Sequence, residues 1–339
     1  MTIFNKPFNY ITLSPILIVL LIGFLLYSQF LSKNTQNNID IVDNSQEQLV
    51  TIKFGYMPFT TNWPVFLAQK EDIFKKNGLS VELVSFNSGV DAANAVISNQ
   101  ISAHAVNTFV DLFNIESRSP NKIKLFAIQQ LSNDGYSEAL IARSDSGIKT
   151  ITDLRGKKIG ITPGTFTETI VQAAYNEEID LSKEAELIKL APNLQLAALE
   201  SGQIDALFAY EPSVTLATMN DNAYIVDDHF FKNVAEPFYL GGFTMSQQFI
   251  ENNPDIAKKI ITSIDQAIKL GKEQPDLKYK AIAEFTSLDE TVVRELKFSK
   301  NIIASDIDPT DLKKASDLYK ELELFEGVII NSESMLVTF

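Results

Sequence analysis

The sequence predicts an α/β protein made of two doubly wound α/β lobes, joined by two crossings of the chain. Three observations support this fold class. Short apolar strands alternate with amphipathic helices from Leu49 onward, the alternation restarts near Lys157, and the chain turns helical after Gly241 and Gly242. Because the C-terminal helices need a sheet to pack on, we expect them to return to the first lobe.

The first lobe is expected to open with the strand VTIKFGYM and the amphipathic helix WPVFLAQKEDIFKKNG, which Gly78 ends at a C′ position. The strand LSVELVSF, a helix from Ser88 and the short strand AHAV follow. The helix TFVDLFNIESR and the strands KIKLFAIQQ and EALIARS continue the pattern. Strands that alternate with helices in this way are typical of a parallel sheet.

The second lobe repeats the alternation. Its expected strands are KKIGI, AELIKL, IDALFAY and AYIVDD, separated by the helices TETIVQAAYNEE, LQLAALESGQ and SVTLATMN. We therefore predict a first lobe over 49–138 and 242–339 and a second lobe over 139–241. Gly241 and Gly242 are a predicted hinge between the lobes, because glycine tolerates unusual backbone angles.

The N-terminal part of the chain is predicted to precede the folded lobes. Residues 1–31 contain the unbroken apolar run ILIVLLIGFLL, and 32–48 form a polar linker rich in Asn and Gln. The apolar stretch is near the roughly 20 residues that span a bilayer, but its core also fits a signal peptide. An uncleaved membrane anchor and a cleaved signal both place Lys33 onward outside the cytoplasm.

Composition excludes several function classes. The net charge of −14, from 29 basic and 43 acidic residues, gives no basic footprint for nucleic acid. The chain has no cysteine, which excludes disulfides, thiolate metal sites and a cysteine nucleophile. His104 and His229 are its only histidines and lie far apart in the sequence, so we predict no metal site and no cofactor.

Four segments resemble one known family in their order and spacing. They are GYMPFTTNWPVFLAQKEDIFKKNGLSVELV, ITDLRGKKIGITPGT, ALESGQIDALFAYEP and NPDIAKKIITSIDQAIK. The chain is similar here to the solute-binding proteins of ABC importers for nitrate, sulfonates, taurine and thiamine precursors. The resemblance implies a periplasmic binding protein type 2 fold, with a ligand cleft between the lobes and no enzymatic activity. It also implies delivery of the ligand to an ABC permease and its ATPase.

Ligands of open α/β sheets bind beyond the carboxyl ends of the strands, where four turns here carry hydroxyl, amide and aromatic side chains. The alternative is that the Ser, Thr and Asn residues are ordinary helix N-caps. From these turns the candidate ligand-binding residues are Pro58, Phe59, Thr61, Asn62, Trp63, Phe86, Asn87, Ser88, Asn107, Thr108, Gly164, Thr165, Phe166 and Thr167. Tyr136, Glu138, Tyr210 and Glu211 complete the predicted set.

The charges near the predicted cleft are acidic. Glu138, Glu211 and Glu236 lie close to it in the sequence, and the four turns contain no Arg or Lys. Thr165 and Glu168 also have the spacing of a capping box, which would satisfy the helix N-terminus internally. These features favour a neutral or amine-bearing ring compound, like a thiamine precursor, over a sulfonate, taurine or nitrate.

The predicted function is the extracytoplasmic solute-binding component of an ABC importer, with a monomer expected. The alternative is a membrane-tethered domain of the same fold that senses a ligand or binds a partner.

Overall fold

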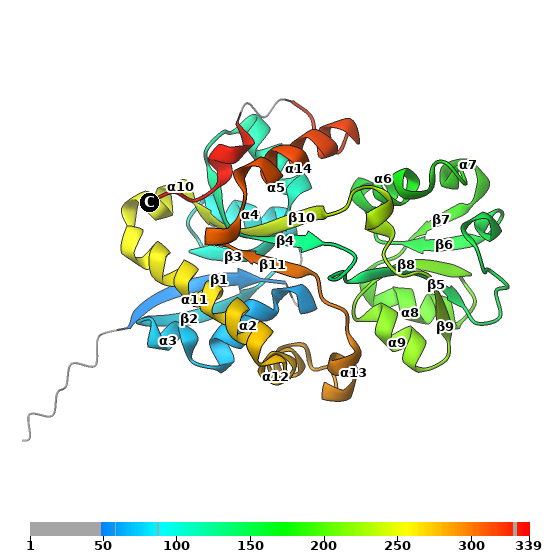
Figure 1. Ribbon diagram of the computed structural model, residues 1–339, viewed down its shortest axis with the longest axis horizontal. Helices are drawn as coiled ribbons and strands as arrows, with labels where there is room; N and C mark the ends of the chain where they lie inside the picture. Colours follow the sequence, from blue (N-terminus) through cyan, green and yellow to red (C-terminus); the bar gives the residue numbers. More distant parts are fainter. Residues whose placement is uncertain (1–48, 58, 87, 328–330) are drawn as a thin grey trace, which may run out of the picture. The chain divides into compact units, whose positions relative to one another are not determined.

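The structure is a computed structural model that describes residues 49–57, 59–86, 88–327 and 331–339. Leu49–Phe339 forms one compact unit with two β-sheets (Figure 1). The predicted N-terminal helix over 1–31 and the linker over 32–48 lie outside the described residues. Within the described ranges, no helix is long and apolar enough to cross a membrane.

The first sheet has six strands in the order β11-β4-β10-β3-β1-β2. Its strands are β1 (Val50–Tyr56), β2 (Leu79–Ser85), β3 (Ala103–Thr108), β4 (Ile123–Leu131), β10 (Phe238–Ser246) and β11 (Lys300–Ile303). β1 pairs in parallel with β2 and β3, whereas β10 is antiparallel to both β3 and β4, and β11 is antiparallel to β4. The predicted α/β lobe is therefore present, but its sheet is mixed.

The second sheet has five strands in the order β7-β6-β8-β5-β9. They are β5 (Glu138–Arg143), β6 (Lys158–Ile161), β7 (Glu186–Lys189), β8 (Ala206–Tyr210) and β9 (Ala223–Asp227). β6 is parallel to β7 and β8, but β5 is antiparallel to β8 and β9. The expected parallel pairing is present between β1, β2 and β3 and between β6, β7 and β8. Both sheets are nevertheless mixed, because β10 and β11 in the first sheet and β5 in the second run against their neighbours.

Helices cover both sheets (Figure 1). Those nearest the first sheet are α2 (Trp63–Lys70), α3 (Ile73–Lys76), α4 (Gly89–Ile97), α5 (Phe109–Arg118), α10 (Gln247–Asn252), α11 (Pro254–Glu273), α12 (Pro275–Thr286), α13 (Glu290–Glu295) and α14 (Pro309–Glu321). Those of the second are α6 (Thr165–Tyr175), α7 (Leu181–Glu184), α8 (Pro192–Glu200) and α9 (Ser213–Met219). The C-terminal helices α11 and α12 pack on α2, and α14 packs on α5.

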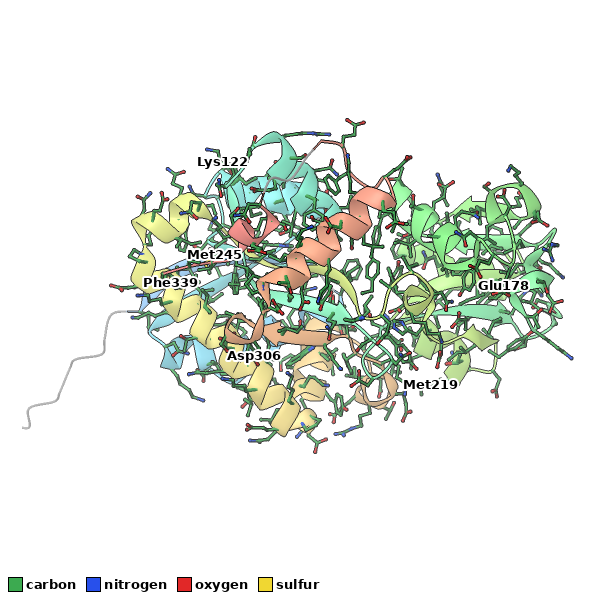
Figure 2. All side chains as sticks on the ribbon, turned by 45° about the horizontal axis from the view of Figure 1, so that its top comes forward. Lys122, Glu178, Met219, Met245, Asp306 and Phe339 are labelled. Atoms are coloured by element: carbon green, nitrogen blue, oxygen red, sulfur yellow. The ribbon has the colours of Figure 1, made fainter. Side chains whose placement is uncertain are left out.

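The predicted helix over 63–78 is divided into α2 and α3. Asp72, between them, has a left-handed backbone with φ of 54°, which ends the first helix. The short 3-10 turns are η1 (Thr60–Asn62), η2 (Ile151–Leu154), η3 (Phe230–Asn233), η4 (Ala304–Asp306) and η5 (Ser332–Met335). Side chains fill the space around these elements, with Met245 buried inside the first sheet and Glu178 at the outer end of the second lobe (Figure 2).

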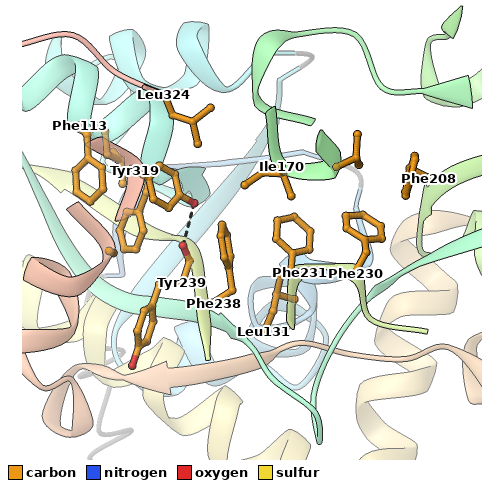
Figure 3. Close-up of a cluster of buried hydrophobic side chains, with 14 of the residues drawn as sticks. Phe113, Leu131, Ile170, Phe208, Phe230, Phe231, Phe238, Tyr239, Tyr319 and Leu324 are labelled. Atoms are coloured by element: carbon orange, nitrogen blue, oxygen red, sulfur yellow. Dashed lines mark hydrogen bonds between the residues drawn. The ribbon is translucent and has the colours of Figure 1, made fainter. Parts of the chain in front are cut away.

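A row of aromatic rings joins the cores of the two lobes (Figure 3). The rings of Tyr319 and Phe238 have centroids 5.7 Å apart, and those of Phe238 and Phe231 are 4.5 Å apart. Phe230 continues the row to Phe208 of β8, with centroids 5.3 Å apart. Such pairs bury large apolar areas, so this side of the interface between the lobes is packed like a protein core.

Two connecting segments link the sheets, 132–137 between β4 and β5 and 228–237 between β9 and β10. A buried hydrogen bond ties the segment 228–237 to the start of β5, because Nδ1 of His229 lies 2.5 Å from Oε1 of Glu138. The ring of Tyr136 stacks on the His229 ring with centroids 5.2 Å apart. The Asn133 N–H donates to Oε1 of Glu236 across the same two segments, at 3.1 Å. Burial raises the pKa of Glu138, and its hydrogen bond with His229 opposes that shift.

Gly241 and Gly242 lie inside β10 and pair with β3 and β4 on either side. They are therefore not in a segment between the sheets, and the hinge predicted there was wrong. Position 241 requires a glycine because the strands pack closely there, and a Cβ on Gly241 would collide with the carbonyl oxygen of Asn107. The return to the first sheet, at Phe238, comes a few residues before the predicted boundary at 241.

We expect Gly241→Ala to lower the free energy of unfolding by about 2–3 kcal/mol, because the added methyl group overpacks the β3–β10 pair. Gly147→Ala is the control. Nothing lies within 4 Å of a Cβ there, so only its positive φ of 72° costs stability, about 1 kcal/mol. Urea unfolding measures both variants, and equal losses would contradict the packing argument.

We expect His229→Phe to lower the free energy of unfolding by about 3–5 kcal/mol, because it leaves the buried Glu138 carboxyl group without its partner. The double variant Glu138→Leu/His229→Phe removes both polar groups and should recover most of that loss. Urea unfolding followed by circular dichroism checks this pair. A single variant as stable as the unmodified chain would show that the hydrogen bond does not hold the segments.

Candidate ligand site between the lobes

A cavity of about 280 Å³ lies where strands of the two sheets end facing each other. Met57 follows β1, Thr108 ends β3, Thr162 follows β6 and Tyr210 ends β8, and all four line the cavity. Both sheets thus present their carboxyl ends to one space, which is the usual position of a ligand in open α/β folds. Its volume is at the small end for ligand pockets, so it suits a small solute.

Eight of the predicted site residues line this cavity together. They are Phe59, Thr61, Asn62, Thr108, Phe166, Thr167, Tyr210 and Glu211. They come from β1, β3, β6 and β8 or the turns that follow, as the predicted turn positions require.

Other predicted residues lie elsewhere in the structure. Ser88 caps α4 by accepting a hydrogen bond from the Asp91 N–H at 3.3 Å. Asn107 belongs to a buried network, where its Oδ1 accepts from the Thr244 hydroxyl at 2.8 Å. The residues that do not line the cavity are Trp63, Phe86, Ser88, Asn107, Tyr136, Glu138, Gly164 and Thr165. Pro58 and Asn87 lie outside the described residues.

Ten lining residues were not predicted. They are Met57, Val106, Gln129, Ser137, Thr162, Pro192, Gln195, Pro212, Ser213 and Leu240. Gln129 is a polar residue near the end of the largely apolar, buried strand β4, which is a signal that the sequence does contain. Gln195 is fixed by donating to the Leu190 carbonyl at 3.1 Å and to Oγ1 of Thr162 at 3.2 Å.

The backbone is strained where β3 meets the cavity. His104 pairs with Thr244 and Asn107 with Gly242, so Ala105 and Val106 together oppose one residue of β10 and form a β-bulge. Val106 has a φ of 50°, which is rare for a β-branched residue. Strain of this kind gathers at binding sites, and here it lies on a wall of the cavity.

The cavity lining among the described residues contains no Lys, Arg or His and a single carboxylate, Glu211. That carboxylate accepts from the Thr215 N–H and the Lys297 N–H, both at 3.1 Å, and from the Thr215 hydroxyl at 2.9 Å. Burial raises the pKa of Glu211, and these hydrogen bonds oppose the shift. Because Lys297 precedes β11 of the first sheet, Glu211 also joins the two lobes.

Four helices begin at the cavity without a cap from the side chain of their N-cap residue, namely α2, α6, α8 and α9. The capping box predicted for Thr165 and Glu168 was wrong. Gly164, with a φ of 119°, is the N-cap of α6, and Glu168 instead pairs with Nζ of Lys189 at 2.7 Å. α2 and α8 offer few first-turn N–H groups, because Pro64 and Pro192 have none and the Trp63 N–H already donates to the Thr60 carbonyl. The N-terminus of α6, which has no side-chain cap, is the one that favours an anion.

Metal binding has no support in the described part of the chain, where no group of three or more His, Asp or Glu side chains could hold a metal ion. His104 is buried, its Nδ1 lies 3.1 Å from Oδ1 of Asn107, and burial lowers its pKa to about 4. It therefore stays neutral inside the first lobe.

Trp63 is 4% exposed and packs in the core between α2 and α11, where its ring touches Gly271. It does not line the cavity, so its predicted role as a stacking wall is not supported by its position. On the first turn of α2 the ring turns toward the helices that cover the sheet.

We expect Trp63→Ala to lower the free energy of unfolding by about 3–5 kcal/mol, since it leaves a large void in the core. Phe59→Ala is the control, because Phe59 lines the cavity but is 42% exposed. It should cost about 1 kcal/mol or less. Thermal unfolding followed by circular dichroism compares the two, and equal stability would contradict the core position of Trp63.

Known proteins resemble the chain in sequence and in structure. A taurine-binding periplasmic protein of Escherichia coli (strain K12) is 26% identical over 68% of this chain and 70% of its own length. A Bacillus subtilis (strain 168) protein, provisionally named as aliphatic sulfonates-binding, is 25% identical over 74% of both chains.

Among solved structures, the periplasmic aliphatic sulphonate binding protein SsuA from Escherichia coli has the same fold, with a TM-score of 0.67 and 16% identity over 84% of this chain and 91% of that one. The desulfurization enzyme DszB also shares the fold, with a TM-score of 0.65 and 14% identity over 84% of this chain and 96% of that one. The family model described as NMT1/THI5 like matches residues 60–277, more than half of the chain, and the chain therefore belongs to the NMT1/THI5-like family.

Proposed function

We propose that the chain is the solute-binding component of an ABC importer, which captures a small solute in the cavity between its lobes and delivers it to a membrane permease. The observation that carries this proposal is the cavity itself, which is lined by the strand ends of both sheets. A ligand that touches both lobes gains contacts when they approach, so its binding favours the closed arrangement.

The relatives support this role and its location. Two are named as binding proteins for taurine and aliphatic sulfonates, and one is named as periplasmic. The nitrate import ATP-binding protein NrtC of a Synechocystis species is 22% identical over 52% of this chain and 28% of its own length. We therefore propose an extracytoplasmic position, with an ABC permease and its ATPase as partners and a monomer as the binding unit.

The proposed motion is a rotation of the lobes about the segments 132–137 and 228–237. The hydrogen bond between Glu138 and His229 would keep these two segments together during the rotation. Hinges of this kind need only a few residues that change their φ and ψ. The aromatic row through Tyr319 and Phe231 packs one side of the interface, so opening is expected on the side where Glu211 accepts from Lys297.

We propose a solute with an acidic group, such as an alkyl sulfonate, as the ligand. The N-terminus of α6, which has no side-chain cap and whose Phe166 and Thr167 line the cavity, supplies N–H donors and partial positive charge. Two features of the sequence that favoured a neutral ring compound no longer support it in the structure. Glu138 pairs with His229 away from the cavity lining, and Glu168 pairs with Lys189 rather than capping α6.

The fold also carries an enzyme, DszB, but we propose no catalysis for this chain. Its cavity lining in the described residues offers hydroxyl groups but no histidine or lysine to activate them, and the chain has no cysteine. The alternative role as a tethered sensor has no observation in its favour.

We expect butane-1-sulfonate to raise the melting temperature of the full-length chain, held in mild detergent, because a ligand of the folded state stabilises it by about 2.7 kcal/mol at 100 times its Kd. Butan-1-ol, with the same apolar body and no acidic group, should have no comparable effect. Stabilisation by pyrimidines but by no sulfonate would instead favour the ring compound.

A matched pair of variants tests the position of the site. Phe59→Ala removes an aromatic wall of the cavity and should weaken butane-1-sulfonate binding several-fold in calorimetry. Val90→Ala removes another exposed apolar side chain, on α4 and outside the cavity lining, and should leave the affinity unchanged. Equal affinities for both variants would place the binding site elsewhere.

A further inference from the structure

We infer that the ligand carries an N–H donor in addition to its acidic group, and that Asn62 is the residue that selects for it. This inference rests on the proposed solute-binding function and concerns the same cavity. It follows from two residues that line the cavity and whose buried amide oxygens have no hydrogen-bond partner among the described residues, Asn62 with its Oδ1 and Gln129 with its Oε1.

Asn62 holds an unusual position for an asparagine. It is the N-cap of α2, where an Asn oxygen normally accepts from a backbone N–H of the first turn. Here the side chain makes no such bond, and the second helical residue is Pro64, which has no N–H. Asn62 is nevertheless 0% exposed, so water cannot reach the side chain freely.

The orientation of the Asn62 amide is set by its neighbours. Its Nδ2 donates to the Phe59 carbonyl at 3.5 Å and to Oγ1 of Thr61 at 3.3 Å. A carbonyl only accepts, so turning the amide over would bring two oxygens together. Oδ1 is thereby held as an unpaired buried acceptor, which is costly unless a donor meets it.

Gln129 contributes a second polar atom from β4. It is 0% exposed, and its Nε2 donates to Oγ of Ser299 at 2.6 Å, which leaves Oε1 unpaired. Because a serine hydroxyl can donate or accept, Gln129 can turn to present either amide atom. Asn62 therefore requires a donor on the ligand, whereas Gln129 can turn to present whichever amide atom the ligand needs.

The charge of the lining agrees with a donor on the ligand. A ligand with acceptor atoms alone would bring its oxygens against Oδ1 of Asn62, with no Lys, Arg or His among the described lining residues to offset the repulsion. An ammonium group would instead be attracted by this oxygen and by the carboxylate of Glu211, which lines the same cavity. With an acidic group at the N-terminus of α6, the lining fits a small zwitterion, such as an aminoalkyl sulfonate or an amino acid.

Calorimetry on the full-length chain with taurine and ethanesulfonate tests the inference, because the two probes differ only in the amino group. We expect taurine to bind at least tenfold more tightly. Asn62→Leu should weaken taurine binding tenfold or more and change ethanesulfonate binding by less than threefold. Asn62→Asp keeps an oxygen acceptor and should keep the preference for taurine, which tests the idea even if the leucine variant does not fold.

Asn301→Leu is the control variant. Asn301 is an equally buried amide, 2% exposed, with two unpaired polar atoms, but it does not line the cavity. Its replacement should leave the ratio of the two affinities unchanged. The melting temperature of each variant without ligand shows whether it is folded.

Equal binding of taurine and ethanesulfonate, or equal weakening of both by Asn62→Leu, would overturn the inference and leave the solute-binding function intact. If neither sulfonate bound, the proposal of an acidic group on the ligand would be wrong. Binding of butylamine would then test the N–H donor separately. Butylamine binding that Asn62→Leu weakens would support the inference, and no binding of butylamine would overturn it.

Discussion

The buried hydrogen bond between Glu138 and His229 joins the two segments that carry the chain from one sheet to the other. A carboxyl group in a low-dielectric interior is stable only with a partner, so neither segment can move away from the other without exposing or orphaning it. Because Glu138 is also the first residue of β5, this bond fixes where the second sheet begins. The arrangement of the strand ends follows from it.

The cavity follows from the direction in which β5 enters the second sheet. β4 ends at the interface between the lobes and β5 starts there, so β5 is antiparallel to β8. The carboxyl ends of β6 and β8 therefore face those of β1 and β3 across the cavity. One side of the interface is closed by the aromatic row around Tyr319 and Phe238. The other side is held by the hydrogen bond between Glu211 and the Lys297 N–H, which a small rotation can break.

The sequence predicted the alternation of strands and helices and the turns that line the cavity, because strand–turn–helix patterns are local. Phe59, Thr108 and Tyr210 line the cavity at the positions where these turns place them, and their contact with a ligand stays a prediction. Trp63 was not placed correctly, since the direction of its ring depends on Gly271, which is distant in the sequence. The antiparallel entry of β5 and β10, and the bulge at Val106, also depend on pairings that no local pattern contains.

Asn62 shows that a local sequence pattern also cannot predict the role of a single side-chain atom. As an N-cap residue it was equally consistent with closing its own helix or with binding a ligand, because both uses require the same side chain at the same position. The Phe59 carbonyl decides between them by taking the amide N–H group, and Pro64 removes one N–H that a cap would use. The oxygen is then left unpaired on a residue that lines the cavity, while the N-terminus of α6 offers donors to the same space. A binding site that offers an acceptor on one wall and donors on the others selects for a ligand with both kinds of group, and a sulfonate alone satisfies only half of it.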